Sequence, residues 1–182
     1  MFTGLAKDLG RVVRIGGGKI LIKTSLEGIE EGDSVMVDGV CLTASEVKPG
    51  SVCMDVGTET LKVTALGTLR AGSRVNLEDS LTLSSKLGGH IVYGHVMEVG
   101  RIISRRRMKN TIIFRIKAPK SFTDKLITKG SVSVNGVSLT VNRVDKNFFE
   151  VGLIPETLAR TNLGNVRMVN LEADMLIMGG RG

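Results

Sequence analysis

The sequence predicts an all-β protein made of two tandem, homologous six-stranded Greek-key barrels with short helices. Three observations support this fold class. Blocks of sequence recur in the same order, apolar residues mostly alternate with period two, and turn residues separate the short apolar segments. The chain has 23 glycines and three prolines, which fits many tight turns. Short strands whose edges must be hidden favour closed barrels.

An internal repeat divides the chain near its middle. The hexapeptide DGVCLT at 38–43 returns as NGVSLT at 135–140, an offset of 97 residues. Other blocks, including TETL and PETL, or VNLE and VNLE, keep the same order with small shifts of the offset. Chance similarity does not preserve order over several blocks. We therefore expect two domains, 1–89 and 90–182.

Each repeat contains six segments that alternate apolar and polar residues between turn signals. In the first repeat these expected strands are 11–15, 19–25, 34–40, 41–47, 51–56 and 74–78. In the second repeat they are 100–104, 111–117, 131–137, 138–144, 148–153 and 167–173.

Three segments predict short helices instead. Segments 58–67 and 155–164 each begin with a capping-type residue or a proline and end in glycine. Segment 121–128 shows an apolar period near 3.6.

The net charge of +7 is unevenly distributed. Residues 1–90 carry ten Lys/Arg and eleven Asp/Glu, whereas residues 91–182 carry fifteen and seven. Much of the excess lies in 101–110, which is either a phosphate-binding patch or, as we favour, the solvated tip of a hairpin. With no Trp, one Tyr and five Phe, the chain has few rings on which nucleic-acid bases stack.

No apolar run approaches the roughly 18–20 residues of a membrane span, and MFTGLAKDLG has no basic stretch followed by an apolar one, so we expect no secretory signal. Two cysteines, Cys41 and Cys53, make no disulfide framework. We expect a cytoplasmic protein with no membrane partner.

The repeated hexapeptide places a nucleophilic atom at the same point of each repeat. Asp-Gly and Asn-Gly favour hairpin turns, and a strand follows. Alternation puts Cys41 and Thr43 on one face of that strand, and Ser138 and Thr140 on the equivalent face. The alternative is a purely structural turn with Cys41 as a small buried apolar residue.

Two further features suggest binding chemistry. The amino ends of 58–67 and 155–164 offer backbone N–H groups beside Thr60 and Thr157, although simple capping explains them equally well. Both histidines, His90 and His95, lie at the repeat junction without acidic or sulfur partners at metal spacing, so we expect no metal. Either can act as a general base near neutral pH or serve a structural role.

These motifs together resemble the riboflavin synthase family. The resemblance rests on MFTG, the paired [DN]-G-V-[CS]-L-T, the junction GGHIVYGHV, IPETL and the closing VNLE, and it spans essentially residues 1–175 in order. It implies that each barrel holds one 6,7-dimethyl-8-ribityllumazine. A four-carbon unit passes between the two molecules, giving riboflavin and 5-amino-6-ribitylaminopyrimidinedione without metal or cofactor.

The resemblance also implies the reactive and substrate-binding residues. The reactive set is Cys41, Ser138, His90 and Asp174. The amino-terminal segment contributes Phe2, Thr3, Gly4, Leu5 and Ala6. The first barrel contributes Ser34, Cys41, Leu42, Thr43, Gly57, Thr58 and Thr60. The second contributes Lys129, Ser138, Leu139, Thr140, Ile154, Glu156 and Thr157, grouped with Gly94, His95 and Val96 from the junction.

Two positions depart from the family pattern. Tyr93 stands where the first repeat has Thr3, and the chain ends in DMLIMGGRG where the family continues with a trimerisation helix. We therefore expect that helix to be absent or truncated and self-association to be weakened. Docking with the lumazine synthase that supplies the substrate stays open.

Two other functions stay open beside the enzyme. A non-catalytic lumazine- or flavin-binding protein shares the implied fold and repeat. An OB-like nucleic-acid binder is favoured only by the basic second half, and we expect no nucleic-acid partner.

Overall fold

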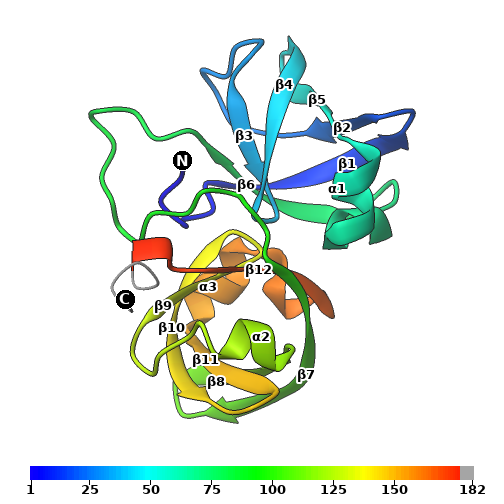
Figure 1. The fold of residues 1–182 in the computed structure, drawn as a ribbon. Helices are drawn as coiled ribbons and strands as arrows, with labels where there is room; N and C mark the ends of the chain where they lie inside the picture. Colours follow the sequence, from blue (N-terminus) through cyan, green and yellow to red (C-terminus); the bar gives the residue numbers. More distant parts are fainter. Residues whose placement is uncertain (177–182) are drawn as a thin grey trace.

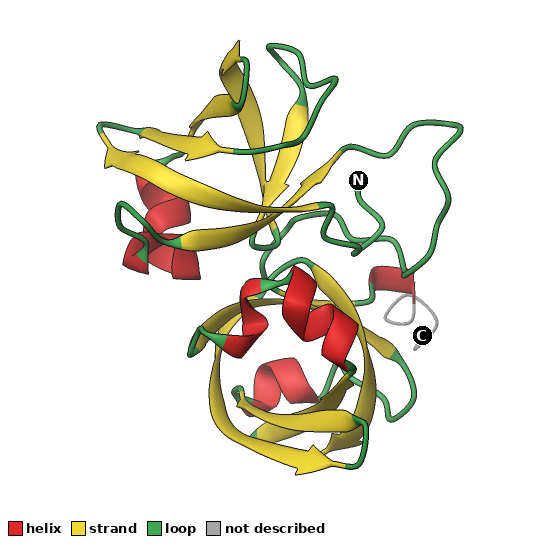
Figure 2. Cartoon of the chain, turned by 180° about the vertical axis from the view of Figure 1, so that it is seen from behind, coloured by secondary structure: helices red, strands yellow, loops and turns green. Residues whose placement is uncertain are grey.

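The computed structural model describes residues 1–176 and confirms the predicted all-β class. Two closed six-stranded antiparallel barrels lie one above the other (Figure 1). The view from behind shows the short helices at the ends of the barrels (Figure 2).

The first barrel follows the strand order β1-β2-β5-β4-β3-β6. Its strands are β1 (Asp8–Gly16), β2 (Lys19–Lys23), β3 (Ser34–Val37), β4 (Val40–Lys48), β5 (Ser51–Asp55) and β6 (Arg74–Asp79). All six coincide with segments of alternating sequence, because the apolar side chains of each strand turn into the barrel.

The second barrel follows the order β10-β11-β8-β7-β12-β9, which is the same arrangement one repeat later. Its strands are β7 (Glu98–Met108), β8 (Thr111–Lys117), β9 (Ser131–Val134), β10 (Val137–Val144), β11 (Phe148–Leu153) and β12 (Met168–Ala173). The basic segment 101–110 comprises the end of β7 and the turn to β8; apart from the buried Ile102 it is exposed, as the favoured hairpin interpretation requires.

Two of the three predicted helices have the expected extent. Each is an α-helix followed by a 3-10 turn: α1 (Thr58–Val63) with η1 (Ala65–Thr68), and α3 (Pro155–Arg160) with η2 (Asn162–Gly164). The third helix, α2 (Lys120–Thr123), is shorter than the expected 121–128. After Thr123 the helical bonds give way to i→i+3 bonds, from the Lys125 N–H to the Phe122 carbonyl and from the Leu126 N–H to the Thr123 carbonyl, and the α-helix does not continue.

The repeated DG and NG dipeptides form the predicted tight turns. Asp38 and Gly39 have φ of 46° and 82°, and Asn135 and Gly136 have φ of 48° and 76°, as a type I′ turn requires. The two turns also touch each other, since a Cβ on Gly39 would lie 2.8 Å from the backbone N of Gly136. Glycine is therefore required here by both conformation and space.

A buried polar network joins the barrels around these turns. The side chain of Asn76 donates to the Asn135 carbonyl (2.9 Å), and that of Asn170 donates to the Asp38 carbonyl (2.7 Å). The amide of Asn162 donates to both carboxylate oxygens of Asp38 at 2.8 and 3.0 Å. Asn76 and Asn170 are equivalent residues of the two repeats, so the network has approximate two-fold symmetry.

Within residues 1–176, no helix combines the length and the apolar character that crossing a membrane requires. The expected loss of the carboxy-terminal helix concerns residues 177–182, which lie outside the described part of the chain.

The network predicts a pH-dependent stability. Burial raises the pKa of Asp38 to about 7, against the hydrogen bonds from Asn76 and Asn162. Because an unfolded Asp titrates near pH 4, the stabilising contribution of protonated Asp38 is complete below about pH 4 and is lost as pH rises through about 7. Asp38→Asn should therefore gain roughly 2 kcal/mol over the native chain between pH 5 and pH 8.

Urea denaturation at intervals from pH 5 to pH 8 measures this difference. Asp33→Asn, which changes an exposed carboxylate, is the control and should show no such trend. A free-energy difference between Asp38→Asn and the native chain that stays constant with pH would contradict the assignment.

Candidate functional site

The segment that precedes each barrel crosses over and completes the other barrel. Phe2 and Val92 pair as an antiparallel bridge, with N–H to O distances of 2.7 and 3.0 Å. Beyond the bridge, the Gly4 carbonyl accepts a hydrogen bond from the Ser138 N–H at 2.8 Å. In the equivalent contact, the Gly94 carbonyl accepts from the Cys41 N–H at 3.0 Å.

This crossing corrects one expectation. We grouped Gly94 and His95 with the second barrel, but the structure sets Gly94 against Cys41 of the first barrel. Val96 likewise packs against the core of the first barrel. The sequence order of the junction suggested the nearer barrel, whereas the antiparallel bridge carries the segment to the other one.

The crossed segments leave no room for a side chain at two glycines. A Cβ on Gly4 would lie 2.6 Å from Cβ of Ser138, and a Cβ on Gly94 would lie 2.6 Å from Cβ of Cys41. Both glycines also have left-handed φ, of 76° and 79°. Backbone therefore passes directly over each of the two predicted nucleophilic residues.

Two buried glutamates hold these segments in place. Glu78 accepts hydrogen bonds from the Thr3 N–H (2.6 Å), the Thr3 hydroxyl (2.6 Å) and the Gly4 N–H (3.1 Å). Glu172 accepts from the N–H groups of Tyr93 (2.7 Å), Gly94 (2.9 Å) and His95 (2.9 Å). The match of Tyr93 to Thr3 is thus confirmed in space.

Burial raises the pKa of Glu78 and of Glu172, and the backbone N–H donors oppose that rise. Sequence reasoning missed the role of both residues. The signal was present, because the two glutamates close the repeated VNLE blocks on β6 and β12.

Two of the four expected reactive residues, Ser138 and His90, meet beside the second barrel, and the charge of Asp174 acts on His90. The Nδ1 atom of His90 lies 2.7 Å from Oγ of Ser138, within hydrogen-bonding distance. Burial lowers the pKa of His90, and the charge of Asp174 opposes that shift. Within residues 1–176, the buried Nε2 atom of His90 has no hydrogen-bond partner. A neutral imidazole with one free nitrogen is suited to accept or hold a proton.

Cys41, the fourth residue, occupies the equivalent position of the first barrel. It is half-buried, carries a free thiol and packs against Phe2, Met36 and Val92. Along β4 the side chain of Cys41 faces away from the barrel core that buries Val40, as the alternation of the sequence predicts. The structure therefore forms two related sites, one with Cys41 and one with Ser138 and His90.

A cavity of about 300 Å³ opens beside Ser138. Its walls come from the crossed amino-terminal segment, the start of β10 and the length of α3, and they comprise Gly4, Leu5, Ala6, Val137, Ser138, Ile154, Glu156, Thr157, Arg160 and Thr161. Seven of these ten residues were expected to bind substrate or react. The volume is in the lower range of small-molecule sites.

The remaining expected residues lie at several places on the two barrels. Exposed Thr43 pairs with half-buried Ser34, and exposed Thr140 pairs with half-buried Ser131 at the equivalent strand positions. Leu42 and Leu139 point into the barrel cores, so they offer a ligand only backbone atoms.

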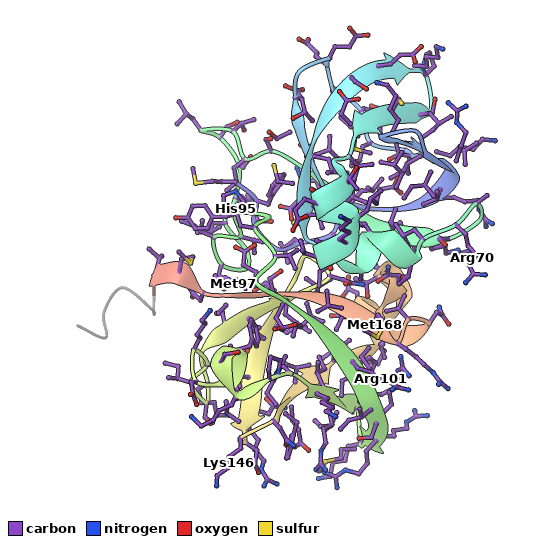
Figure 3. The ribbon with its side chains drawn as sticks, turned by 45° about the vertical axis from the view of Figure 1, so that its right-hand side comes forward. Arg70, His95, Met97, Arg101, Lys146 and Met168 are labelled. Carbon is purple, nitrogen blue, oxygen red and sulfur yellow. The ribbon has the colours of Figure 1, made fainter. Side chains whose placement is uncertain are left out.

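Gly57, Thr58 and Thr60 surround the amino end of α1, as Ile154 and Thr157 do for α3. Exposed His95 stacks on Tyr93, with ring centroids 6.1 Å apart (Figure 3). Lys129 keeps a left-handed φ where the first repeat has Gly32, and non-glycine residues in this conformation are concentrated at functional sites.

A family profile described as "Lumazine binding domain" matches residues 3–80 and 93–174. The chain belongs to the lumazine-binding-domain family. Its two matched regions coincide with the two barrels and their crossed segments.

Sequence relatives and solved structures of similar fold are consistent with this family. The chain is 41% identical to riboflavin synthase of Mycobacterium tuberculosis over 97% of its length and 94% of the relative. It is 36% identical to riboflavin synthase of Bacillus subtilis over 97% of its length and 86% of the relative. LumP complexed with riboflavin is similar in fold, with a TM-score of 0.84 at 22% identity, covering 95% of this chain and 99% of that one.

The glutamate contacts predict a selective loosening of one crossed segment. In Glu172→Gln, an NH₂ group replaces a carboxylate oxygen that accepts backbone N–H groups, so we expect about 1–3 kcal/mol loss in the free energy of unfolding. Amide hydrogen exchange should accelerate at residues 93–95 and stay unchanged at 3–4. Glu78→Gln is the matched variant and should give the reverse pattern. If amide exchange at the two segments were equal in both variants, the glutamates would not hold the crossed segments separately, which would contradict this assignment.

Proposed function

We propose that this protein is a riboflavin synthase. It converts two molecules of 6,7-dimethyl-8-ribityllumazine into riboflavin and 5-amino-6-ribitylaminopyrimidinedione by transfer of a four-carbon unit. The observation that carries the proposal is the pair of equivalent sites that differ in their nucleophilic atom, Sγ of Cys41 and Oγ of Ser138. Riboflavin synthases that are 36% and 41% identical over nearly the whole chain support it.

The two-site geometry suits a reaction between two identical molecules. One lumazine must give the four-carbon unit and the other must accept it, so the two pockets need similar shapes and different chemistry. A cysteine in one and a serine with a histidine in the other supply that difference. Holding the rings in a reactive orientation can contribute roughly 7–11 kcal/mol of barrier lowering.

We propose the following roles for the reactive residues. Ser138 and His90 move the proton that leaves the acidic C7 methyl group of one ring, with Asp174 setting the charge beside His90. Cys41 acts at C7 of the partner ring, where a nucleophile must add. The ring beside Ser138 occupies the cavity between Leu5, Ile154 and Thr157.

We also propose the assembly and setting of the enzyme. The boundary between the two lumazine-binding units lies between Gly89 and His90. Self-association brings the first barrel of one subunit to the second barrel of a neighbour, and lumazine synthase is a candidate partner. The two free cysteines support a cytoplasmic setting.

A non-catalytic lumazine- or flavin-binding protein is the second candidate. The fold of LumP, complexed with its lumazine at a TM-score of 0.81, favours it. The reactive residues Cys41, Ser138 and His90 have no evident use in a carrier, which favours the enzyme.

Incubation with 6,7-dimethyl-8-ribityllumazine alone tests the function. We expect riboflavin fluorescence to grow, with one riboflavin formed for every two lumazines consumed, while mass photometry reports the assembly present during turnover. A stable bound-lumazine spectrum without riboflavin would instead identify a carrier.

The role of Cys41 predicts a large kinetic effect with little structural change. Cys41→Ser should lower kcat about 10²-fold while lumazine binding changes little, because a weaker nucleophile replaces the thiol in the same space. Cys53→Ala, which changes the other free cysteine, is the matched control and should keep its turnover. Full turnover by Cys41→Ser would remove Cys41 from the mechanism.

The lowered pKa of His90 predicts the acidic limb of the pH–rate profile. A histidine that stays neutral below its ordinary pKa keeps its base function at lower pH, so activity should fall only below about pH 6.5. In His90→Gln the remaining activity should lack this limb. An acidic limb that persists unchanged in His90→Gln would assign it to another group.

A further inference from the structure

A second cavity, of about 550 Å³, lies in the cleft between the two barrels. Its walls are the chain segments that follow η1 and η2, at 68–74 and 165–168. Its floor includes Asp38, Asn135 and Asn162 of the buried network. Arg70 and Met168, which line this cavity, lie on the opposite side of the molecule from His95 (Figure 3).

Three arginines line this interbarrel cleft. Arg70 and Arg74 come from the first barrel and Arg167 from the second, and all three are exposed. Within residues 1–176, none of them forms an ion pair with a carboxylate. Arg167 occupies the position of Ser73 in the first repeat, since its carbonyl accepts from the Ile102 N–H as that of Ser73 accepts from the Val12 N–H, yet its side chain lines the same cavity as Arg70 and Arg74. Each barrel therefore directs a guanidinium at the same opening.

A fourth arginine makes one wall rigid and adds positive charge. The guanidinium of Arg105 donates to the carbonyls of Leu163 and Val166 and lies 5.1 Å from the ring centre of Phe114. Burial and the neighbouring charge of Arg167 lower the pKa of Arg105. A fixed cation thus repels Arg167 at the edge of the cleft, and a bound anion would relieve that repulsion.

The rest of the lining suits an organic molecule that carries a phosphate. Ala65, Leu69, Val166 and Met168 form an apolar wall, and the hydroxyls of Thr68 and Ser73 together with the amide of Asn165 lie among the arginines. The volume fits a nucleotide-sized ligand. None of the lining residues in the described chain is aromatic, which disfavours stacking of single-stranded nucleic acid.

We propose that the interbarrel cleft binds a phosphorylated small molecule through Arg70, Arg74 and Arg167, with its ring against the apolar wall. The carboxylate of Asp38 is engaged by Asn76 and Asn162 at the floor, so the phosphate lies at the arginine rim. This site is separate from both lumazine sites and does not depend on the proposed enzyme activity.

Isothermal titration calorimetry with ADP, inorganic pyrophosphate and adenosine tests the proposal. We expect ADP to bind one per chain, pyrophosphate to bind more weakly and adenosine not to bind. Arg74→Gln and Arg167→Gln should each weaken ADP binding about tenfold, since each removes a charge-assisted contact. Arg106→Gln, on the exposed hairpin outside the cleft, is the matched control and should change the affinity less than twofold.

A second titration, with riboflavin at saturating concentration, distinguishes ADP binding in the cleft from ADP binding in the lumazine sites. ADP binding that persists with riboflavin present supports the cleft, and displacement by riboflavin would place ADP in the lumazine sites and overturn the proposal. Absence of ADP binding at millimolar concentration would also overturn it. Binding of an RNA oligonucleotide more tightly than ADP would overturn the proposal as well, if Arg106→Gln and Arg167→Gln weakened that binding equally. Lumazine turnover of Arg167→Gln should stay within twofold of the native chain whichever result is obtained.

Discussion

The structure depends on the crossing of two short segments between the barrels. The Phe2–Val92 bridge brings the backbone of each segment over a reactive residue of the opposite barrel, and Glu78 and Glu172 fix that backbone by accepting its N–H groups. A buried carboxylate without such donors would be costly, whereas one that receives two or three of them is stable. Site geometry and fold stability therefore rest on the same contacts.

The approximate two-fold symmetry explains both the likeness and the difference of the sites. Hydrogen bonds that recur in both halves, such as those of Asn76 and Asn170, fix the position of one barrel against the other. The exceptions are single substitutions on that common frame: cysteine against serine at the site, and Asp38 against Asn135 in the network. Among the described residues 1–176, a histidine lies within hydrogen-bonding distance of the serine of the second site and none of the cysteine of the first.

Local sequence was sufficient to predict most of the fold. Period-two alternation located all twelve strands, and DG and NG located the turns, because these features depend on neighbours in the chain. The end of α2 was wrong because the apolar spacing continues past Thr123, whereas the backbone turns there and is set by contacts outside the segment. The partner of Gly94 was wrong for the same reason, and the cleft arginines come from loops whose approach no local pattern encodes.

The crossed segments also bear on how such a chain arose. A single repeat standing alone would leave the Gly4 carbonyl and the Cys41 amide without the partners they have here. Two copies of that repeat satisfy both groups by exchanging segments around a true two-fold axis. Fusion of two such copies preserves every contact and frees each half to change independently, which a symmetric homodimer of identical chains does not allow.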